Sequence, residues 1–453
     1  MFFGPALFPL AWFIVKTLWG EYHRRPPLWA TYEPEQFPEV TYYDHVCGVK
    51  YPEIFGGCED IKVYGDYAIV SCDPYKKQSN FLTGYHPGTP SGNVYIWNYV
   101  KDTAPVPIDF GPDFGELRPQ GVRGIYLPDE KDVPATDVLR IFVANAAKNA
   151  SVEVFDFTPG TGMIEKVISL RHKDAVLDPA ALAPISPTQV FLTNTLGYPY
   201  RTILGTLEFI SGIPFGTIGY LDFSNTTNVT GKAVGAITTP IGMEYVDRTL
   251  YVASVQYGIY GYQLYIPPDD IPEEEVAKNQ SLGRMHFYPG EKFYRMPYLP
   301  AHLTYSTELE SMVVAGMNSY SGEIKAWYGR KSASWAGVLV DRSGPDGKPV
   351  IVSDTVTLGL PEAARKFQTL FWDSTGDKFS GLKSMVVENG RRFGVSPHQA
   401  GVLVCSTNGL EPVEVPEILS AGGNEPAGTP VQAKDRQRNS DHLEHMYLAK
   451  EEL

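Results

Sequence analysis

The sequence predicts an all-β protein built from many short strands, and three observations point to that class. The chain has 43 Gly, 37 Pro and 28 Tyr among 453 residues, a composition that favours strands joined by tight turns. Segments rich in Val, Ile, Tyr and Phe alternate with clusters of turn-forming residues, and helical periodicity is scarce. The expected strands are Asn93–Val100, Leu139–Ala146, Ser151–Phe157, Ile164–Arg171, Thr188–Asn194, Thr217–Phe223, Thr249–Gln256, Glu323–Tyr328, Trp335–Val340 and Ser384–Glu388.

The length of this strand-rich region suits a closed β architecture. Residues 41–406 are enough for six four-stranded propeller blades of about 60 residues each. No clear internal repeat marks the blades, so a pair of β-sandwiches is the alternative. We place the domain at residues 41–415. Residues 421–441 are rich in Gly, Pro, Asn, Gln and charge, which predicts a flexible tail over residues 416–453.

Charge excludes some partners. Hydrophobic residues make up 43% of the chain and charged residues 20%, which is typical of a well-buried globular protein. The net charge is −14 and no basic cluster interrupts it. Because nucleic acids and anionic membranes both require a basic face, we expect neither as a partner.

The N-terminus predicts entry into the secretory pathway. Residues 1–15 are almost continuously apolar and Lys16 follows them, which is typical of a signal peptide or signal anchor over residues 1–20. No small-x-small cleavage site follows the apolar run, so the sequence does not decide between a cleaved signal peptide and an uncleaved anchor. A buried amphipathic helix is a further alternative. Membrane association is expected only through this segment. Four Asn-x-Ser/Thr sequons agree with that route and predict N-glycosylation at Asn149, Asn225, Asn228 and Asn279.

The chain ends in Lys450-Glu451-Glu452-Leu453. This is close to the Lys-Asp-Glu-Leu retrieval signal, with one acid replaced by another. We therefore expect the lumen of the endoplasmic reticulum, with secretion as the alternative.

The four cysteines, Cys47, Cys58, Cys72 and Cys405, show no Cys-x-x-Cys spacing. An even number in an oxidising compartment favours disulfides over metal ligands, and three pairings exist. Cys58 and Cys72 bracket a hairpin-like segment whose ends would lie close together. A bond between the remaining two would join the start of the domain to its end. Free buried thiols are the alternative.

Several short motifs in a fixed order resemble the paraoxonase/arylesterase family. They are Gly57–Val63, Leu117–Val122, Ser151–Phe155, Leu170–Lys173, Val190–Asn194 and Gly401–Cys405. The resemblance covers about residues 47–405. It implies a six-bladed β-propeller closed by an N-to-C-terminal disulfide, with two calcium ions in a central tunnel. In that family the catalytic calcium polarises the carbonyl of an ester or lactone.

The positions that match the family's calcium ligands are only partly kept. Glu59 and Asp60 match its acidic pair. Ile241 and Ala301-His302 stand where the family has oxygen donors. The family's Asn-Asp pair aligns near Ala180-Ala181 of this chain, and Asp178 could replace it if the alignment shifts. Gln120 and Asn145 stand where the family has histidines. Because calcium requires six to eight oxygen ligands, we expect weak or absent binding, with Asp60 the residual metal ligand and no cofactor.

Loss of the ion would change the chemistry of Glu59. A carboxylate left in a low-dielectric tunnel has a raised pKa, which would suit Glu59 to donate a proton or hydrogen bond. The alternative is that Glu59 and Asp60 are paired with buried backbone donors or with Lys62.

These features predict an enzyme acting on a hydrophobic small molecule. The resemblance, combined with the lost ligands, implies as the best hypothesis a metal-independent cyclase or hetero-Diels–Alderase of fungal secondary metabolism, which would accelerate its reaction by preorganisation and hydrogen bonding. The alternatives are a calcium-dependent lactonase or arylesterase, with ligands among Asp178, Asn194 and Glu244, and a non-enzymatic luminal binding propeller. The candidate catalytic residues are Glu59, Gln120 and His302, and the candidate substrate-binding residues are Asn145, Asn194, Ile241, Met243 and His398.

Overall fold

The structure is a computed structural model. It describes residues 47–76, 88–111, 114–127, 138–197, 215–255, 258–265, 286–294, 296, 299–317, 326, 329–339 and 367–406. The predicted signal segment, the C-terminal tail with its retrieval motif and the sequon at Asn279 lie outside these residues. Within the described part, no helix is long and apolar enough to cross a membrane.

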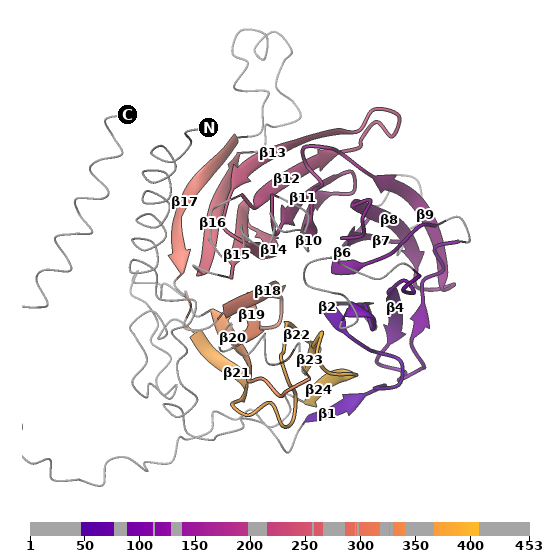
Figure 1. Ribbon diagram of the computed structural model, residues 1–453, viewed down its shortest axis with the longest axis vertical. Coiled ribbons are helices and arrows are strands. Elements are labelled where there is room, and N and C mark those ends of the chain that lie inside the picture. The colour runs from indigo at the N-terminus through magenta and orange to yellow at the C-terminus, as the bar shows by residue number, and fades with distance from the viewer. Residues whose placement is uncertain are drawn as a thin grey trace, which may run out of the picture. The chain divides into compact units, whose positions relative to one another are not determined.

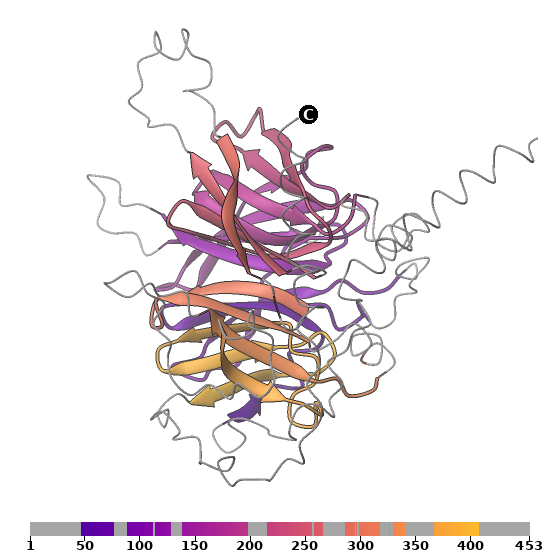
Figure 2. The same cartoon turned by 90° about the vertical axis from the view of Figure 1, so that its left-hand side faces the viewer.

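The described strands form six four-stranded antiparallel sheets, arranged as the blades of a propeller (Figure 1). Figure 2 shows the same sheets after a turn of 90°. The bounds of blades 1 to 3 are β2 (Cys58–Tyr64), β3 (Tyr67–Cys72), β4 (Asn93–Asn98) and β5 (Val106–Pro107); β6 (Pro119–Tyr126), β7 (Leu139–Asn145), β8 (Ser151–Thr158) and β9 (Met163–Leu170); β10 (Pro179–Ser186), β11 (Gln189–Asn194), β12 (Thr217–Asp222) and β13 (Thr230–Ala236). Blades 4 to 6 are β14 (Pro240–Val246), β15 (Thr249–Ser254), β16 (Gly258–Tyr265) and β17 (His286–Tyr294); β18 (Leu299–Ser306), β19 (Ser311–Met317), β20 (Ser334–Leu339) and β21 (Phe367–Asp373); β22 (Ser384–Glu388), β23 (Arg391–Val395), β24 (Val402–Ser406) and β1 (Cys47–Lys50).

Blade 6 closes the ring, because β1 from the start of the domain pairs with β24 from its end. Cys47 lies opposite Cys405 in that pair, and the two form a disulfide across 358 residues of sequence. A second disulfide joins Cys58 to Cys72 across the β2–β3 pair. Both predicted pairings and the six-bladed propeller are confirmed. On the chain-entropy model, the closing bond contributes about 6 kcal/mol by restricting the unfolded chain.

Most of the expected strands match the observed ones to within two residues at either end. One expectation is wrong: Ala326, the one residue of Glu323–Tyr328 that the structure describes, is helical. The sequence analysis also missed a repeat. Pro119, Pro179, Pro240 and Pro300 stand at or next to the first residue of β6, β10, β14 and β18, and they recur about every 60 residues. Proline is tolerated there because the first residue of a strand does not need its N–H for the ladder.

The hydrophobic core lies between the blades. Each pair of neighbouring blades encloses one cluster of buried apolar side chains, and six such clusters run around the ring. Trp97 of blade 1, for example, packs edge-on against Phe393 of blade 6 with ring centroids 6.1 Å apart. This packing fixes the innermost strands β2, β6, β10, β14, β18 and β22 side by side around the centre (Figure 1). We call the end at which these strands begin the upper end, and the end at which they finish the lower end.

Candidate functional site

A β-bulge recurs at the upper end of the innermost strands. Five of the innermost strands, β2, β6, β10, β14 and β18, shift register against the second strand of their blade. The shift occurs at the second or third residue of the innermost strand. Such bulges re-aim a side chain at the rim of a β structure. The bulged residues, together with the residue just before β22, form a set that we call the upper ring: Glu59, Gln120, Ala180, Ile241, Ala301 and Lys383.

The upper ring has a polar half and an apolar half. Lys383, Glu59 and Gln120 come from three adjacent blades, and Ala180, Ile241 and Ala301 come from the other three. The resemblance places oxygen ligands at Glu59 and at or near the three aliphatic residues, a histidine at Gln120 and nothing at Lys383, so only some of the six ring positions match ligand positions. Half of the ring positions carry polar groups and half have no donor atom in the side chain.

Glu59 is bound by two cations of its own chain. Its side chain is fully buried, and its two carboxylate oxygens form separate ion pairs with Nζ of Lys76 and Nζ of Lys383. Burial alone would raise the pKa of Glu59, but the two lysines overcome that effect and lower the pKa to about 2. The expected raised pKa is therefore wrong. Glu59 is a permanent carboxylate near neutral pH and cannot serve there as a proton donor.

Asp60 lies deeper and connects several blades. Its carboxylate accepts hydrogen bonds from Ser384 Oγ at 2.6 Å, from the Val122 amide at 3.1 Å and from Arg123 Nη1 at 3.0 Å. Nδ1 of His302 lies 3.5 Å away. Burial would raise the pKa of Asp60, but His302 and Arg123 together hold it below its ordinary value. The alternative interpretation, pairing with buried backbone donors or with Lys62, holds for Asp60, which contacts both the Val122 amide and Lys62. It does not hold for Glu59, whose partners are Lys76 and Lys383.

The cations around Asp60 are buried as well. Lys62 Nζ lies 3.3 Å from Asp60 and donates to the Leu303 carbonyl at 3.2 Å and to Thr304. Arg123 donates to the carbonyls of Met243 at 2.7 Å and Leu303 at 2.6 Å. Arg123, Lys62 and Asp60 thus form one cluster that joins blades 1, 2, 4 and 5. Unpaired buried charges are costly, so each member of this cluster depends on the others.

His302 belongs to this cluster and not to the upper ring. Its side chain is buried, and burial, assisted by the positive charges of Lys383 and Arg123, lowers its pKa despite the opposing effect of Asp60. Nδ1 has no hydrogen-bond partner among the described residues. Because the side chain does not reach solvent, His302 is a positioning group for Asp60.

Calcium does not fit this set of donors. Each carboxylate of the acidic pair already contacts ammonium, guanidinium or imidazole groups, which would repel a divalent ion. Ile241, Ala180 and Ala301 offer no side-chain oxygen, whereas calcium requires six to eight. Among the described residues, no three of the His, Cys, Asp and Glu side chains are placed to hold a metal. The donor chemistry thus gives the predicted weakness of calcium binding a physical reason.

A chamber of about 310 Å³ occupies the lower end of the innermost strands. Residues from all six blades line it, including Tyr64, Pro184, Glu244, Tyr305 and Val386. Burial raises the pKa of Glu244, although Arg123 opposes the effect. The Asp60 cluster lies above this chamber, between it and the upper ring.

Two predicted substrate-binding residues have extensive structural contacts. The Asn194 side chain accepts from the amides of Leu177 at 2.8 Å and Asp178 at 3.0 Å and donates to the Ala175 carbonyl at 2.9 Å. Asn145, at the same place in blade 2, accepts from the Arg118 amide at 2.8 Å. Both residues end the second strand of a blade and tie it to the segment before the first strand.

The remaining candidates are spread over the molecule. Met243 is fully buried in the cluster between blades 3 and 4, so its side chain packs in the core. Ile241 is partly exposed in the upper ring. Gln120 is also partly exposed, and its backbone carbonyl accepts from Ser71. His398 follows β23, where its amide donates to Ser396 Oγ at 3.0 Å. The structure therefore brings only Glu59, Gln120 and Ile241 together in one ring.

Three sequons lie in described turns. Asn149 is exposed in the β7–β8 turn, and Asn225 and Asn228 are exposed in the β12–β13 turn. Glycosylation at these positions remains a prediction.

Sequence reasoning missed Lys76, Lys383 and Arg123. The available signal was chemical: two adjacent acids predicted to be buried, with no metal to neutralise them, require cations from elsewhere in the chain. Of the three, Lys383 was the easiest to predict, because it stands immediately before the predicted strand Ser384–Glu388.

Comparison with known proteins gives no family. No family model matches the chain, and no curated protein matches it. Similar solved structures include a putative gluconolactonase that is 12% identical, covers 84% of this chain and 97% of its own, and has a TM-score of 0.39. A putative 6-phosphogluconolactonase from Bacteroides uniformis is 13% identical over 70% of this chain and 74% of its own, with a TM-score of 0.37. A catalytically inactive virginiamycin B lyase from Staphylococcus aureus is 10% identical and has a TM-score of 0.36. The match covers 79% of this chain and 97% of the lyase. Likeness this distant carries no argument about activity.

Proposed function

We propose that the protein is an enzyme that acts on a hydrophobic, carbonyl-bearing small molecule at the upper ring without calcium, and that its reaction is a cyclisation, with a hetero-Diels–Alder cycloaddition as the best candidate. The observation that carries the proposal is the neutralisation of Glu59 by Lys76 and Lys383. A site with internal cations has no need of an external one. We further propose that the protein works in the lumen of the endoplasmic reticulum.

The two lysines supply the chemistry in this proposal. Their side chains are 13% and 15% exposed, whereas Glu59 is fully buried. A substrate carbonyl at the upper ring therefore meets cationic N–H donors that the carboxylate holds in place. Preorganised donors stabilise negative charge that develops on oxygen in a transition state. Hydrogen bonding to the oxygen of an unsaturated carbonyl makes it a better acceptor of electron density from an alkene.

The apolar half of the ring supplies the orientation. Ile241 is partly exposed and offers an aliphatic contact across the ring from the lysines, whereas its neighbours in the ring, Ala180 and Ala301, are buried and keep that side free of polar side chains. A molecule with a carbonyl at one end and an alkene at the other would lie across the ring with both ends matched. In a cycloaddition the two new σ bonds form from existing π electrons, so no proton donor, leaving group or nucleophile is needed. Holding the reacting ends together is then the main source of acceleration.

The test compares two reactions in the presence and absence of a chelator. Purified protein is analysed for metal and then assayed for trapping of an ortho-quinone methide by an electron-rich alkene, and for hydrolysis of an aryl ester and a lactone. We expect faster and stereoselective cycloadduct formation that EDTA does not change. Stoichiometric calcium, together with hydrolysis that EDTA abolishes, would instead identify a lactonase or arylesterase.

Variants locate the activity. Lys383→Met removes one donor, and we expect the rate of cycloadduct formation to fall by about tenfold or more, because one preorganised donor is worth about that much or more. Lys331→Met is the matched control, since Lys331 also pairs with a carboxylate, that of Asp377, but both side chains are exposed. Equal rates for the two variants would remove the lysines from the mechanism.

A further inference from the structure

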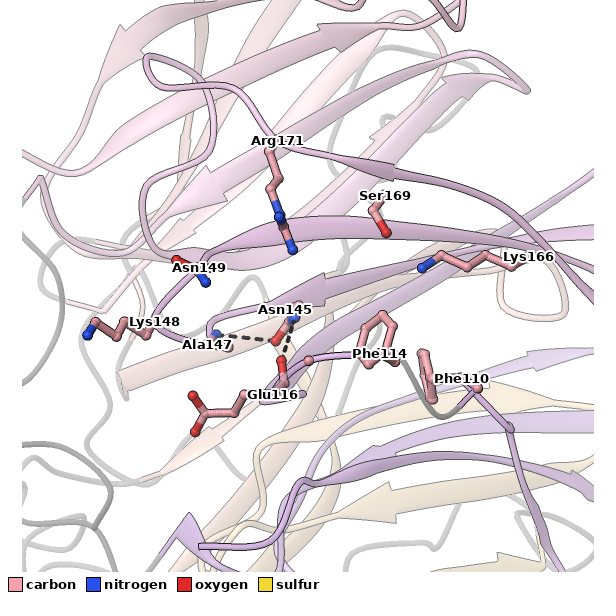
Figure 3. Close-up of a pocket in the computed structure, with 12 residues that line it drawn as sticks. Phe110, Phe114, Glu116, Asn145, Ala147, Lys148, Asn149, Lys166, Ser169 and Arg171 are labelled. Carbon is pink, nitrogen blue, oxygen red and sulfur yellow. Dashed lines mark hydrogen bonds between the residues drawn. The ribbon is translucent and has the colours of Figure 1, made fainter. Parts of the chain in front are cut away.

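A second cavity lies on the upper edge of blade 2, separate from the innermost strands (Figure 3). Its volume is about 440 Å³, within the range of small-molecule sites. Three parts of the chain line it: residues 110–111 and 114–116 before β6, residues 145 and 147–149 at the β7–β8 turn, and residues 166, 169 and 171 in and after β9. None of the residues that line it belongs to the upper ring or to the lower chamber.

The cavity is positively charged in an acidic protein. Lys148, Lys166 and Arg171 line it against the single acid Glu116, whereas the whole chain carries −14. Among the described residues, Arg171 has no ion-pair or hydrogen-bond partner, and neither has Lys148. In Figure 3 the guanidinium of Arg171 points toward the middle of the cavity, while Lys148 points outward at the rim.

The nearby acids do not neutralise Arg171. The carboxylate of Glu116 is held by Arg118 at 2.8 Å. Glu153, buried behind the cavity, accepts from Ser151 Oγ at 2.6 Å and lies 3.7 Å from Lys166 Nζ. The negative charges near the cavity are thus engaged by other groups.

An aromatic wall faces the cations. The rings of Phe110 and Phe114 lie 4.7 Å apart, and Phe155 packs edge-on behind Phe110 at 4.9 Å. Lys166 Nζ lies 4.7 Å from the centre of the Phe114 ring, in cation–π contact. Phe114 is partly exposed, so a flat apolar surface is available beside a fixed positive charge.

We propose that this cavity binds a small aromatic carboxylate. The carboxylate pairs with the guanidinium of Arg171, whose planar donors match it in a bidentate fashion. The aromatic ring of the ligand packs against Phe114, next to the ammonium of Lys166. Lys148 adds only long-range attraction, because it points away from the rings (Figure 3).

The probe is 2-naphthoate, titrated into the full-length protein by isothermal calorimetry, with the neutral 2-naphthylmethanol as its uncharged analogue. We expect naphthoate to bind with a dissociation constant below about 1 mM. The dissociation constant of the alcohol should be higher by about tenfold or more. Arg171→Ala should weaken naphthoate binding by about tenfold or more, and Phe114→Ala by about fivefold.

Lys148→Ala is the matched control, because it removes the same charge from the rim of the same cavity. We expect it to weaken binding by less than about threefold at physiological ionic strength, since exposed charges are screened there. No heat of binding at about 10 mM naphthoate would overturn the proposal. Equal binding of the alcohol, or equal losses for Arg171→Ala and Lys148→Ala, would also overturn it.

Discussion

Asp60→Asn is the sharpest test of how the centre of the propeller is held together. The substitution keeps the shape of the side chain and removes its charge. In the native protein the carboxylate is fully buried and receives hydrogen bonds from Ser384, Val122 and Arg123. An amide keeps one acceptor oxygen, but in either orientation its NH₂ group faces N–H donors that cannot accept from it: the Ile61 amide on one side, or the Val122 amide and Arg123 on the other.

The magnitude follows from what stays behind. Without the carboxylate, Arg123 and Lys62 remain buried, at 3% exposure each, and lose their closest counter-charge. Removing one partner from a buried ion pair costs about 3–5 kcal/mol. Asp102→Asn provides the comparison, because Asp102 pairs with Lys50 at 2.7 Å while both side chains are nearly half exposed. Such a surface pair is worth about 0–1 kcal/mol.

The assay is equilibrium unfolding in urea with both disulfides intact, followed by circular dichroism. We expect Asp60→Asn to lower the free energy of unfolding by at least about 3 kcal/mol and Asp102→Asn by no more than about 1 kcal/mol. If Asp60→Asn costs as little as the surface variant, the Asp60 cluster does not hold the blades together. The argument that cations of the chain itself neutralise the buried acidic pair would then fail.

Three further predictions follow from the same structure. Replacing Cys47 and Cys405 with serine should cost about 6 kcal/mol on the chain-entropy model, against about 3 kcal/mol for the hairpin disulfide, so the first double variant should have the lower urea midpoint. Because the pKa of Glu59 is about 2 in the folded protein and 4.5 ordinarily, its ion pairs contribute stability above about pH 4.5 that is lost as the pH falls toward 2. The melting temperature should drop over that window in the native protein and less steeply in Lys383→Met; parallel curves would show that the pair is not responsible. Asn194→Ala should cost about 2 kcal/mol by leaving two amides unsatisfied, and an unchanged melting temperature would refute that role.

Much of the fold could be read from the chain. Strands such as Ser384–Glu388 were predicted at their observed bounds because apolar β-formers stand between turn residues. The disulfide pairing followed from the hairpin between Cys58 and Cys72. The prolines at Pro119, Pro179 and Pro240 would also have revealed the blade repeat, since their spacing is present in the sequence.

The sequence also singled out residues that the structure places in one ring. Glu59 and Asp60 were singled out before the structure, and the aliphatic residues Ile241 and Ala301 were recognised as positions without oxygen donors. These expectations came from the resemblance, which supplied the positions, and from residue type, which the sequence states completely.

What the tertiary structure decided is the electrostatic state of those residues. The sign of a buried acid's pKa shift depends on whether burial or a nearby cation dominates, and Lys383 lies 324 residues from Glu59 in the sequence. The β-bulges that align the upper ring and the packing that buries Asp60 against Arg123 are likewise products of blades meeting at the centre. The sequence by itself determined which groups the protein carries and which strands present them. Only the folded ring determined which charges meet, because electrostatic energies depend on distances that no local pattern encodes.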